Sequence, residues 1–352
     1  SARGGGAWLS PTGALAAVSV GLAHVMAEDA PLAAMPRRLL DRRLWLAAAA
    51  AMVAFLAAVP YAAANWPAFS ADVALLAERG RIGFKGLALS PDPGWRFYLS
   101  ALDWGMGRPF LVGSVLGLAA GLAGRRRPEL ILACSALCLY AYLSPQLLLF
   151  ERFILPALPP LAVLIGSLLV RLADRLERRW NRRASATMLT LAVAAIAACP
   201  LARSLRFDWL LTRTDTRTLA RAWIEENLPV GSRIVVQSNG PELAPADDGH
   251  PFEVQVVGTT DLEERPVEAL AEQGVDFVVV SSFSTERRLL DPVADAERRD
   301  YYAGLDRALP MLEEFLPYRG GSAPPFLFAQ VYGPATDLWR FERPGPELRV
   351  YR

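Results

Sequence analysis

Residues 154–173 read ILPALPPLAVLIGSLLVRLA, a run of 20 residues in which Ser167 and Arg171 are the only strongly polar side chains. A helix needs about 20 mostly apolar residues to cross the hydrocarbon core of a membrane. This stretch therefore predicts a membrane-spanning helix.

Five further apolar stretches occur before residue 204. Together with the first they predict six transmembrane helices, at roughly 9–27, 44–63, 106–123, 129–149, 154–173 and 185–203. The composition agrees, because 53% of the 352 residues are hydrophobic, 21% are charged and the mean hydropathy is +0.24. These values argue against a purely soluble two-domain protein.

Charge is distributed unevenly along the chain, although the formal net charge is only +1. Residues 1–203 carry 21 basic against 11 acidic side chains, whereas residues 204–352 carry 16 against 25. Nucleic-acid binding requires basic residues on an accessible face, so the acidic second part argues against a nucleic-acid partner. Thirteen basic residues fall in every second predicted loop: Arg37, Arg38, Arg42, Arg43, Arg125, Arg126, Arg127, Arg171, Arg175, Arg178, Arg179, Arg182 and Arg183.

Arginine clusters in alternate loops indicate the cytoplasmic side of a membrane protein. The alternation puts the loop 64–105, the turn 151–153 and everything after about residue 204 on the outside. We therefore expect a multi-pass protein of the cell inner (plasma) membrane, with a transmembrane region at 1–203 and an extracytoplasmic domain at 204–352. Because the chain starts at Ser1 without Met, we interpret it as the carboxyl-terminal part of a longer membrane protein.

The cysteines give no metal signature. Cys134 and Cys138 lie four residues apart in an apolar run, without His or further Cys at ligand spacing. We interpret these two and Cys199 as small buried apolar residues, and we predict no metal ligands in this chain.

The loop 64–105 carries one set of candidate binding residues. It is too long for a simple connector, and it combines basic with aromatic side chains. It fits a platform whose cations contact an anion and whose rings pack against a sugar or lipid. It equally fits an interfacial aromatic belt that binds no ligand. The platform would consist of Arg81, Lys85, Trp95, Arg96 and Tyr98.

Arg152 is the other candidate. It follows Glu151 in a short turn between two predicted helices, directly before a proline-rich helix start. Ionisable residues at the membrane face are often functional, and a guanidinium pairs well with a lipid-linked phosphate. The alternative is an arginine that reaches the headgroups and pairs with Glu151.

Residues 204–352 change to a soluble pattern. Alternating helix and strand signals predict a small α/β layer domain. We expect helices at 215–227, 266–273 and about 295–314, and strands at 233–237, 252–257, 275–280, 326–332 and 347–351. The domain shows no glycine-rich phosphate loop and no paired catalytic residues, so we expect no activity from this domain alone.

Several motifs in this order resemble bacterial membrane glycosyltransferases of the GT-C superfamily, in particular the protein O-mannosyltransferase-like and aminoarabinose-transferase-like groups. The motifs are WRFYL at 95–99, GMGRP at 105–109, RFILPALPP at 152–160, DTR at 215–217 and PVGSRI at 229–234. The resemblance implies the inverting transfer of one sugar from a polyprenyl-phosphate carrier to a lipid, glycan or protein acceptor on the outer face of the membrane.

The resemblance also implies roles for individual residues. Arg152, and with it Arg81 or Lys85, would hold the phosphate leaving group and stabilise its growing charge. The catalytic acidic residue, which acts as general base, would lie upstream of Ser1. Some members of these groups work without an obligatory metal, whereas others need a divalent cation, so the resemblance leaves a divalent cation open as a cofactor.

Two other classes of function stay open at this point. A non-catalytic membrane scaffold or sensor with an extracytoplasmic α/β domain fits the chain as it stands. A transporter is less favoured, because polar residues at mid-span and paired broken helices are almost absent from the predicted helices.

Overall fold

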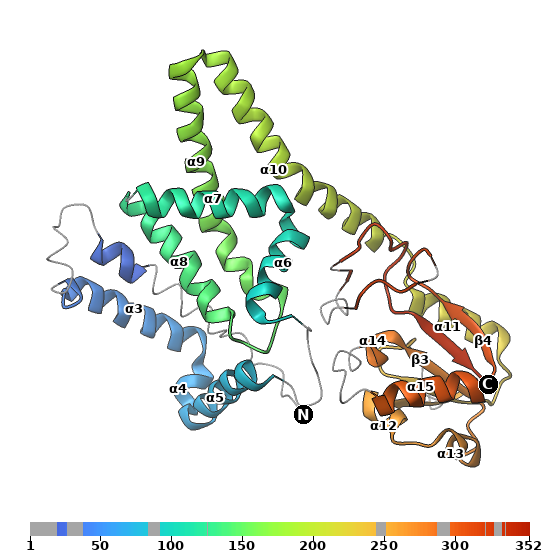
Figure 1. The fold of residues 1–352 in the computed structure, drawn as a ribbon. Helices are drawn as coiled ribbons and strands as arrows, with labels where there is room; N and C mark the ends of the chain where they lie inside the picture. Colours follow the sequence, from blue (N-terminus) through green and yellow to red (C-terminus); the bar gives the residue numbers. More distant parts are fainter. Residues whose placement is uncertain are drawn as a thin grey trace. The chain divides into compact units, whose positions relative to one another are not determined.

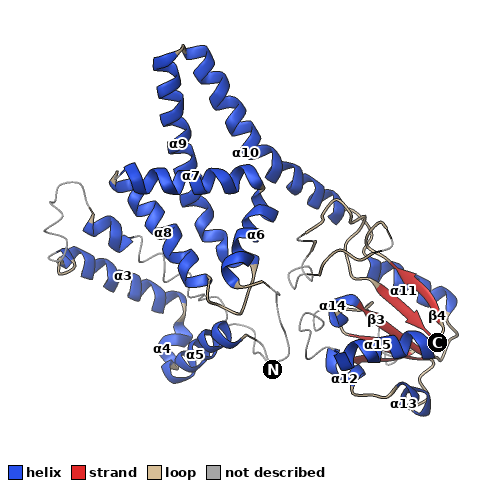
Figure 2. Cartoon of the chain, viewed as in Figure 1, coloured by secondary structure: helices blue, strands red, loops and turns tan. Residues whose placement is uncertain are grey.

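The computed structural model describes residues 20–26, 38–83, 92–124, 126–243, 251–286, 296–320, 322–326, 333–334 and 336–352. This part of the chain forms two compact units, which divide between Pro200 and Leu201. The first unit is helical, and the second contains a five-stranded sheet (Figures 1 and 2).

The described part of the first unit consists of a succession of helices. Proline lies in the first turn of several of them, where its missing N–H would be unpaired in any case. The helices are α3 (Arg42–Ala58), α4 (Pro60–Ala64), α5 (Trp66–Ile82), α6 (Gly94–Met106), α7 (Arg108–Gly124), α8 (Arg127–Leu143), the 3-10 helix η2 (Glu151–Ala157), α9 (Leu158–Arg179) and the larger part of α10 (Arg182–Leu211).

The prediction of six transmembrane helices is wrong. Among the described residues, two helical segments are long and apolar enough to cross a membrane: Glu151–Arg179 and Arg182–Asn227. The helices α3, α7 and α8 each have 17 residues. That length is about 26 Å at 1.5 Å per residue, less than the roughly 30 Å of the hydrocarbon core.

Local chemistry explains where the expected helices fail. α3 ends at Ala58 because Val59 precedes Pro60 and leaves the helical region, with φ −126° and ψ 71°. α8 ends at Leu143, so the predicted span at 129–149 loses its last turn and a half. The predicted span at 9–27 is described only at residues 20–26. The expected loop 64–105 contains two helices, α5 and α6.

Glycine allows α7 to pack closely against α9. A Cβ added at Gly117 would lie 3.0 Å from the carbonyl carbon of Leu164 and 3.1 Å from the backbone nitrogen of Ile165. Gly113 and Gly121 lie four residues to either side and face the same two residues of α9. Small residues at this spacing let the backbones of apolar helices approach one another. The contact therefore depends on the missing side chain at Gly117.

A buried ion pair joins α8 to α9. Glu129 is 7% exposed, and its two carboxylate oxygens accept hydrogen bonds from Arg171 Nη1 and Ser167 Oγ, both at 2.6 Å. Arg171 lies within the predicted span 154–173 and was counted with the basic residues after it. In α9 it neutralises a carboxylate of the neighbouring helix.

The second unit is built on a mixed sheet with the strand order β2-β1-β3-β5-β4. β1 (Arg233–Gln237) pairs in parallel with β2 (Glu253–Val257) and β3 (Phe277–Ser281). β5 (Leu348–Tyr351) is antiparallel to β3 and to β4 (Met311–Phe315). The strands near 233–237, 252–257, 275–280 and 347–351 lie where the sequence predicts them.

Alternating side chains give this sheet two apolar faces. Ile234, Val236 and Val279 pack on the side of α11 (Thr216–Asn227), which Asp215 caps through its side chain. Val235, Val278 and Val280 pack on the other side, against α12 (Thr259–Glu263), α13 (Val267–Glu272) and α15 (Ala296–Ala308). The continuous apolar runs of β1 and β3 follow from this burial on both faces.

One prediction in this unit differs from the structure, a second is not tested by it, and the prediction for the cysteines concerns the first unit. The helix predicted at about 295–314 ends at Ala308, and Met311–Phe315 forms an edge strand instead, because Pro310 cannot continue a helix. The strand predicted at 326–332 lies almost wholly outside the described residues. Of the three cysteines that were expected to be buried, Cys138 is exposed, and Cys134 and Cys199 are partly exposed.

Candidate functional site

Three of the predicted binding residues lie in the first turns of α6, which are fixed against the end of α8. A Cβ added at Gly94 would lie 2.5 Å from the carbonyl oxygen of Ser144, so the two backbones are in direct contact. Tyr140 of α8 donates a hydrogen bond through Oη to the carbonyl oxygen of Trp95, at 2.6 Å. These contacts position Trp95, Arg96 and Tyr98.

Tyr98 is fully buried, and its hydroxyl lies near the start of η2. Oη lies against the backbone of Phe150 without a hydrogen bond of good geometry to any described residue. Burial raises the pKa of Tyr98, and the neighbouring Glu151 carboxylate adds to that effect. Glu151 Oε1 is also buried and makes no hydrogen bond within the described ranges. Buried polar atoms without partners are costly, so two of them together indicate a polar site.

Arg152 is exposed and is held by aromatic rings. Its guanidinium carbon lies 4.2 Å from the ring centroid of Phe150 and 5.6 Å from that of Phe153. The two rings are themselves in edge contact, with centroids 5.4 Å apart. Cation–π contacts of this kind orient a guanidinium at an exposed position. The structure therefore brings Tyr98 and Arg152 to the same junction of α6 with η2.

The other predicted residues are arranged differently. Arg96 is exposed and lies 3.5 Å from Asp92, one helical turn earlier, so it forms a surface ion pair. Trp95 is half exposed. Arg81 lies exposed in the last turn of α5, and its charge acts on Tyr142 of α8. Lys85 lies outside the described residues.

The sequence did not single out the link between α5 and the segment before η2. The backbone nitrogen of Leu147 donates to the carbonyl oxygen of Gly80 at 2.8 Å, and Gln146 packs on the same glycine. This link brings the helix that carries Arg81 to the connection between α8 and η2. No pattern in the sequence marks it, because the contact joins residues 67 positions apart through backbone atoms.

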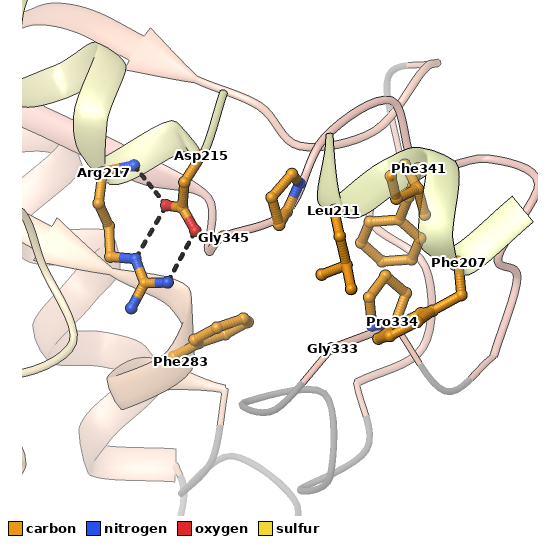
Figure 3. Close-up of a pocket in the computed structure, with 11 residues that line it drawn as sticks. Phe207, Leu211, Asp215, Arg217, Phe283, Gly333, Pro334, Phe341 and Gly345 are labelled. Atoms are coloured by element: carbon orange, nitrogen blue, oxygen red, sulfur yellow. Dashed lines mark hydrogen bonds and ion pairs between the residues drawn. The ribbon is translucent and has the colours of Figure 1, made fainter. Parts of the chain in front are cut away.

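The second unit has a cavity of about 220 Å³ that the sequence did not predict. Asp215 and Arg217 form one side, in a two-pronged ion pair with Nε–Oδ1 at 2.9 Å and Nη2–Oδ2 at 2.7 Å. Phe207 and Phe341 lie on the opposite side (Figure 3). The DTR motif thus contributes a wall to this cavity, although its charges already satisfy each other.

A smaller cavity of about 110 Å³ surrounds Arg349. The guanidinium contacts three carboxylates: Glu314 at 2.9 Å, Glu347 at 2.7 Å and Asp306 at 3.5 Å. Burial raises the pKa of Glu286 at the edge of this cavity, and the charge of Glu347 raises it further. Arg349 is neutralised by these partners, which favours a structural role.

Polar side chains also gather at the carboxyl ends of β1 and β3, where open α/β sheets often bind ligands. Ser238 Oγ lies 3.1 Å from Ser284 Oγ, and Asn239 Nδ2 donates to the same Ser284 oxygen at 3.3 Å. Ser281 Oγ donates to the carbonyl oxygen of Asn239 at 3.1 Å. These groups satisfy one another, so they stabilise the two connections.

The described residues contain no group of three or more His, Cys, Asp or Glu side chains that could hold a metal ion. No protein-family model matches the chain, and neither a curated protein nor a solved structure matches it. The candidate site therefore rests on the geometry of Tyr98, Glu151 and Arg152.

Proposed function

We propose that this chain belongs to a membrane glycosyltransferase that transfers a sugar from a polyprenyl-phosphate carrier to a lipid, glycan or protein acceptor. Arg152 binds the phosphate of the carrier. The observation that supports the proposal most is the exposed guanidinium, bracketed by Phe150 and Phe153, at the start of a helical segment apolar enough to cross a membrane.

The neighbours of Arg152 suit such a ligand. A lipid-linked phosphate needs a cation near the membrane face and apolar surroundings for its chain. Arg152 supplies the cation, and Leu155, three residues later, is exposed near the start of the apolar segment. The buried oxygens of Glu151 and Tyr98 add polar groups to the same junction of α6 with η2.

The orientation of the chain is part of the proposal. The ends of α9 and α10 that flank the turn between them carry Arg178, Arg179, Arg182 and Arg183. Such a cluster between two spanning helices favours the cytoplasmic side. The opposite ends of both helices, with Arg152 and the second unit, then lie on the outer face of the plasma membrane.

A binding experiment tests the assignment of Arg152 without requiring the transfer reaction. The purified chain, in detergent, is titrated with undecaprenyl phosphate and with undecaprenol, which lacks the phosphate. Charge-assisted hydrogen bonds contribute roughly 1.5–3 kcal/mol. The Arg152→Ala variant should therefore raise the Kd for the phosphate on the order of 10- to 100-fold and leave that for the alcohol unchanged.

Two variants complete the test. Arg152→Lys keeps the charge without the two-pronged geometry, so it should recover only part of the affinity. Arg126→Ala removes an exposed arginine before α8 and should change neither Kd. Equal affinity of the native chain for both lipids, or native affinity in Arg152→Ala, would contradict the proposal and favour a scaffold without a lipid-phosphate substrate.

A further inference from the structure

A cluster of tryptophan and arginine lies where α10 ends in the second unit. Trp209 is 37% exposed, and the guanidinium carbons of Arg206 and Arg213 lie 4.1 and 4.3 Å from its ring centroid. Trp339 comes from the carboxyl-terminal segment, is 62% exposed, and lies 5.7 Å from Arg206. We call these four residues the Trp–Arg patch.

The patch continues an apolar stripe along α10. Leu201, Leu205 and Trp209 follow one another at four-residue intervals, and all three are exposed. Residues at this spacing lie on one face of a helix. An exposed apolar stripe that ends in tryptophan is typical of a surface with a binding partner.

The charge of the patch contrasts with that of its surroundings. Residues 204–352 carry 16 basic against 25 acidic side chains. Arg206 donates through Nη2 to the carbonyl oxygen of Phe341 at 2.6 Å, and Arg213 stacks on Trp209. Within the described ranges neither guanidinium has a carboxylate within 4 Å. The patch is thus a local cationic surface on an acidic unit, complementary to an anionic partner.

The length of α10 indicates which partner lies there. The helix has 30 residues, or about 45 Å at 1.5 Å per residue. A bilayer is roughly 30 Å thick in its hydrocarbon core and 40–45 Å thick with its headgroups. When Arg182 and Arg183 lie among the cytoplasmic headgroups, the last two turns of α10 reach the headgroups of the opposite leaflet.

We propose that the Trp–Arg patch binds the anionic headgroup layer of the outer leaflet and attaches the second unit to the lipid surface. Tryptophan is enriched at headgroup depth, and arginine is attracted to anionic lipids. The proposal goes beyond glycosyl transfer and does not involve Arg152. It rests on α10 crossing the membrane, which the experiment tests separately.

A spin label attached to a single introduced cysteine, at each of three positions in turn, tests the patch in the full chain. The native cysteines are replaced by alanine, the chain is reconstituted in phosphatidylcholine vesicles with and without phosphatidylglycerol, and one cysteine is introduced by Trp339→Cys, Ala194→Cys or Val230→Cys. Collision with oxygen reports lipid, and collision with a nickel chelate reports water. Ala194 lies in the middle of α10, and Val230 is an exposed apolar residue beyond the far end of α11.

We expect lipid accessibility at 194, headgroup depth at 339 and water accessibility at 230. Phosphatidylglycerol should increase the protection at 339 from nickel. The additional change Arg213→Gln should abolish that increase, and the fold should be retained because Arg213 is exposed.

Each of the other outcomes contradicts one part of the proposal. Water accessibility at 339 with lipid accessibility at 194 would leave α10 in the membrane and exclude the patch. Water accessibility at both positions would exclude the spanning helix. A label at 339 that is protected from both reagents in detergent without lipid would show that a second chain covers the patch.

Discussion

Glu129 joins two helices of the first unit through hydrogen bonds of 2.6 Å to Arg171 and Ser167. Removing one partner of a buried pair leaves the other charge buried without compensation, at a cost of about 3–5 kcal/mol. Glu129→Ala should therefore lower the stability of the first unit by about this amount, as measured by thermal unfolding in detergent. Pairing Glu129→Leu with Arg171→Met should restore most of the loss. A loss as large in the pair as in Glu129→Ala would exclude the ion pair as its cause.

Glu286 makes the stability of the second unit depend on pH. Burial and the charge of Glu347 raise its pKa above the usual 4.5. A raised carboxyl pKa means that the folded state binds the proton more tightly. This contribution to stability is complete below pH 4.5 and is lost as the pH rises through the folded-state pKa.

Glu286→Gln should therefore stabilise the second unit at pH 7 relative to the native chain and change little at pH 4. Urea unfolding monitored by tryptophan fluorescence measures the difference. Glu272→Gln, at an exposed position of α13, is the control. If the difference in stability between Glu286→Gln and the native chain is the same at pH 4 and pH 7, the raised pKa of Glu286 is not its cause.

At the scale of helices, the contact between α7 and α9 depends on Gly117. Glycine in a helix interior is about 1 kcal/mol less favourable than alanine. Gly166 of α9 has open space around it, so Gly166→Ala should be neutral or stabilising. Gly117→Ala places a Cβ within 3.0–3.1 Å of the α9 backbone, so it should lower the melting temperature despite the better helix propensity. Equal effects of the two substitutions would show that the packing is loose.

The elements that the sequence predicted correctly are those decided by local signals. β1 and β3 are short apolar runs bounded by turns, and α11 begins at the capping carboxylate of Asp215. The mistakes arise where a helix must end. The apolar pattern continues through Ala58 and Val59 and predicts a continuous helix, but Pro60 forces the backbone of Val59 out of the helical region. In the same way, Pro310 ends the helical region after α15. The residues that follow it form β4 because they pair with β5.

The candidate site was predictable only in part. Arg152 and Tyr98 were singled out from residue type and position, and the structure brings their elements together. The unpartnered oxygen of Glu151 and the cavity beside Asp215 depend on residues distant in sequence. Composition cannot indicate such contacts, because they arise only after the chain packs.

For the whole molecule, the proposed orientation can be tested by thiol labelling. In a chain whose native cysteines are replaced, Val230→Cys reports the second unit and Arg179→Cys reports the turn between α9 and α10. A membrane-impermeant maleimide should label position 230 in intact spheroplasts and position 179 only after lysis, because arginine-rich turns stay in the cytoplasm. The reverse pattern would invert the proposed topology.

The strand order of the second unit has a consequence for protein synthesis. β5 lies between β3 and β4, yet Leu348 leaves the ribosome about 67 residues after Ser281, the last residue of β3. At a synthesis rate of 5–20 residues per second, the valine-rich edge of β3 stays unpaired for roughly 3–13 seconds until β5 has been synthesised. An unpaired strand edge of this kind is a site for wrong pairing. Nascent chains should therefore be most prone to aggregation, and most in need of a chaperone, while residues 282–347 are being translated.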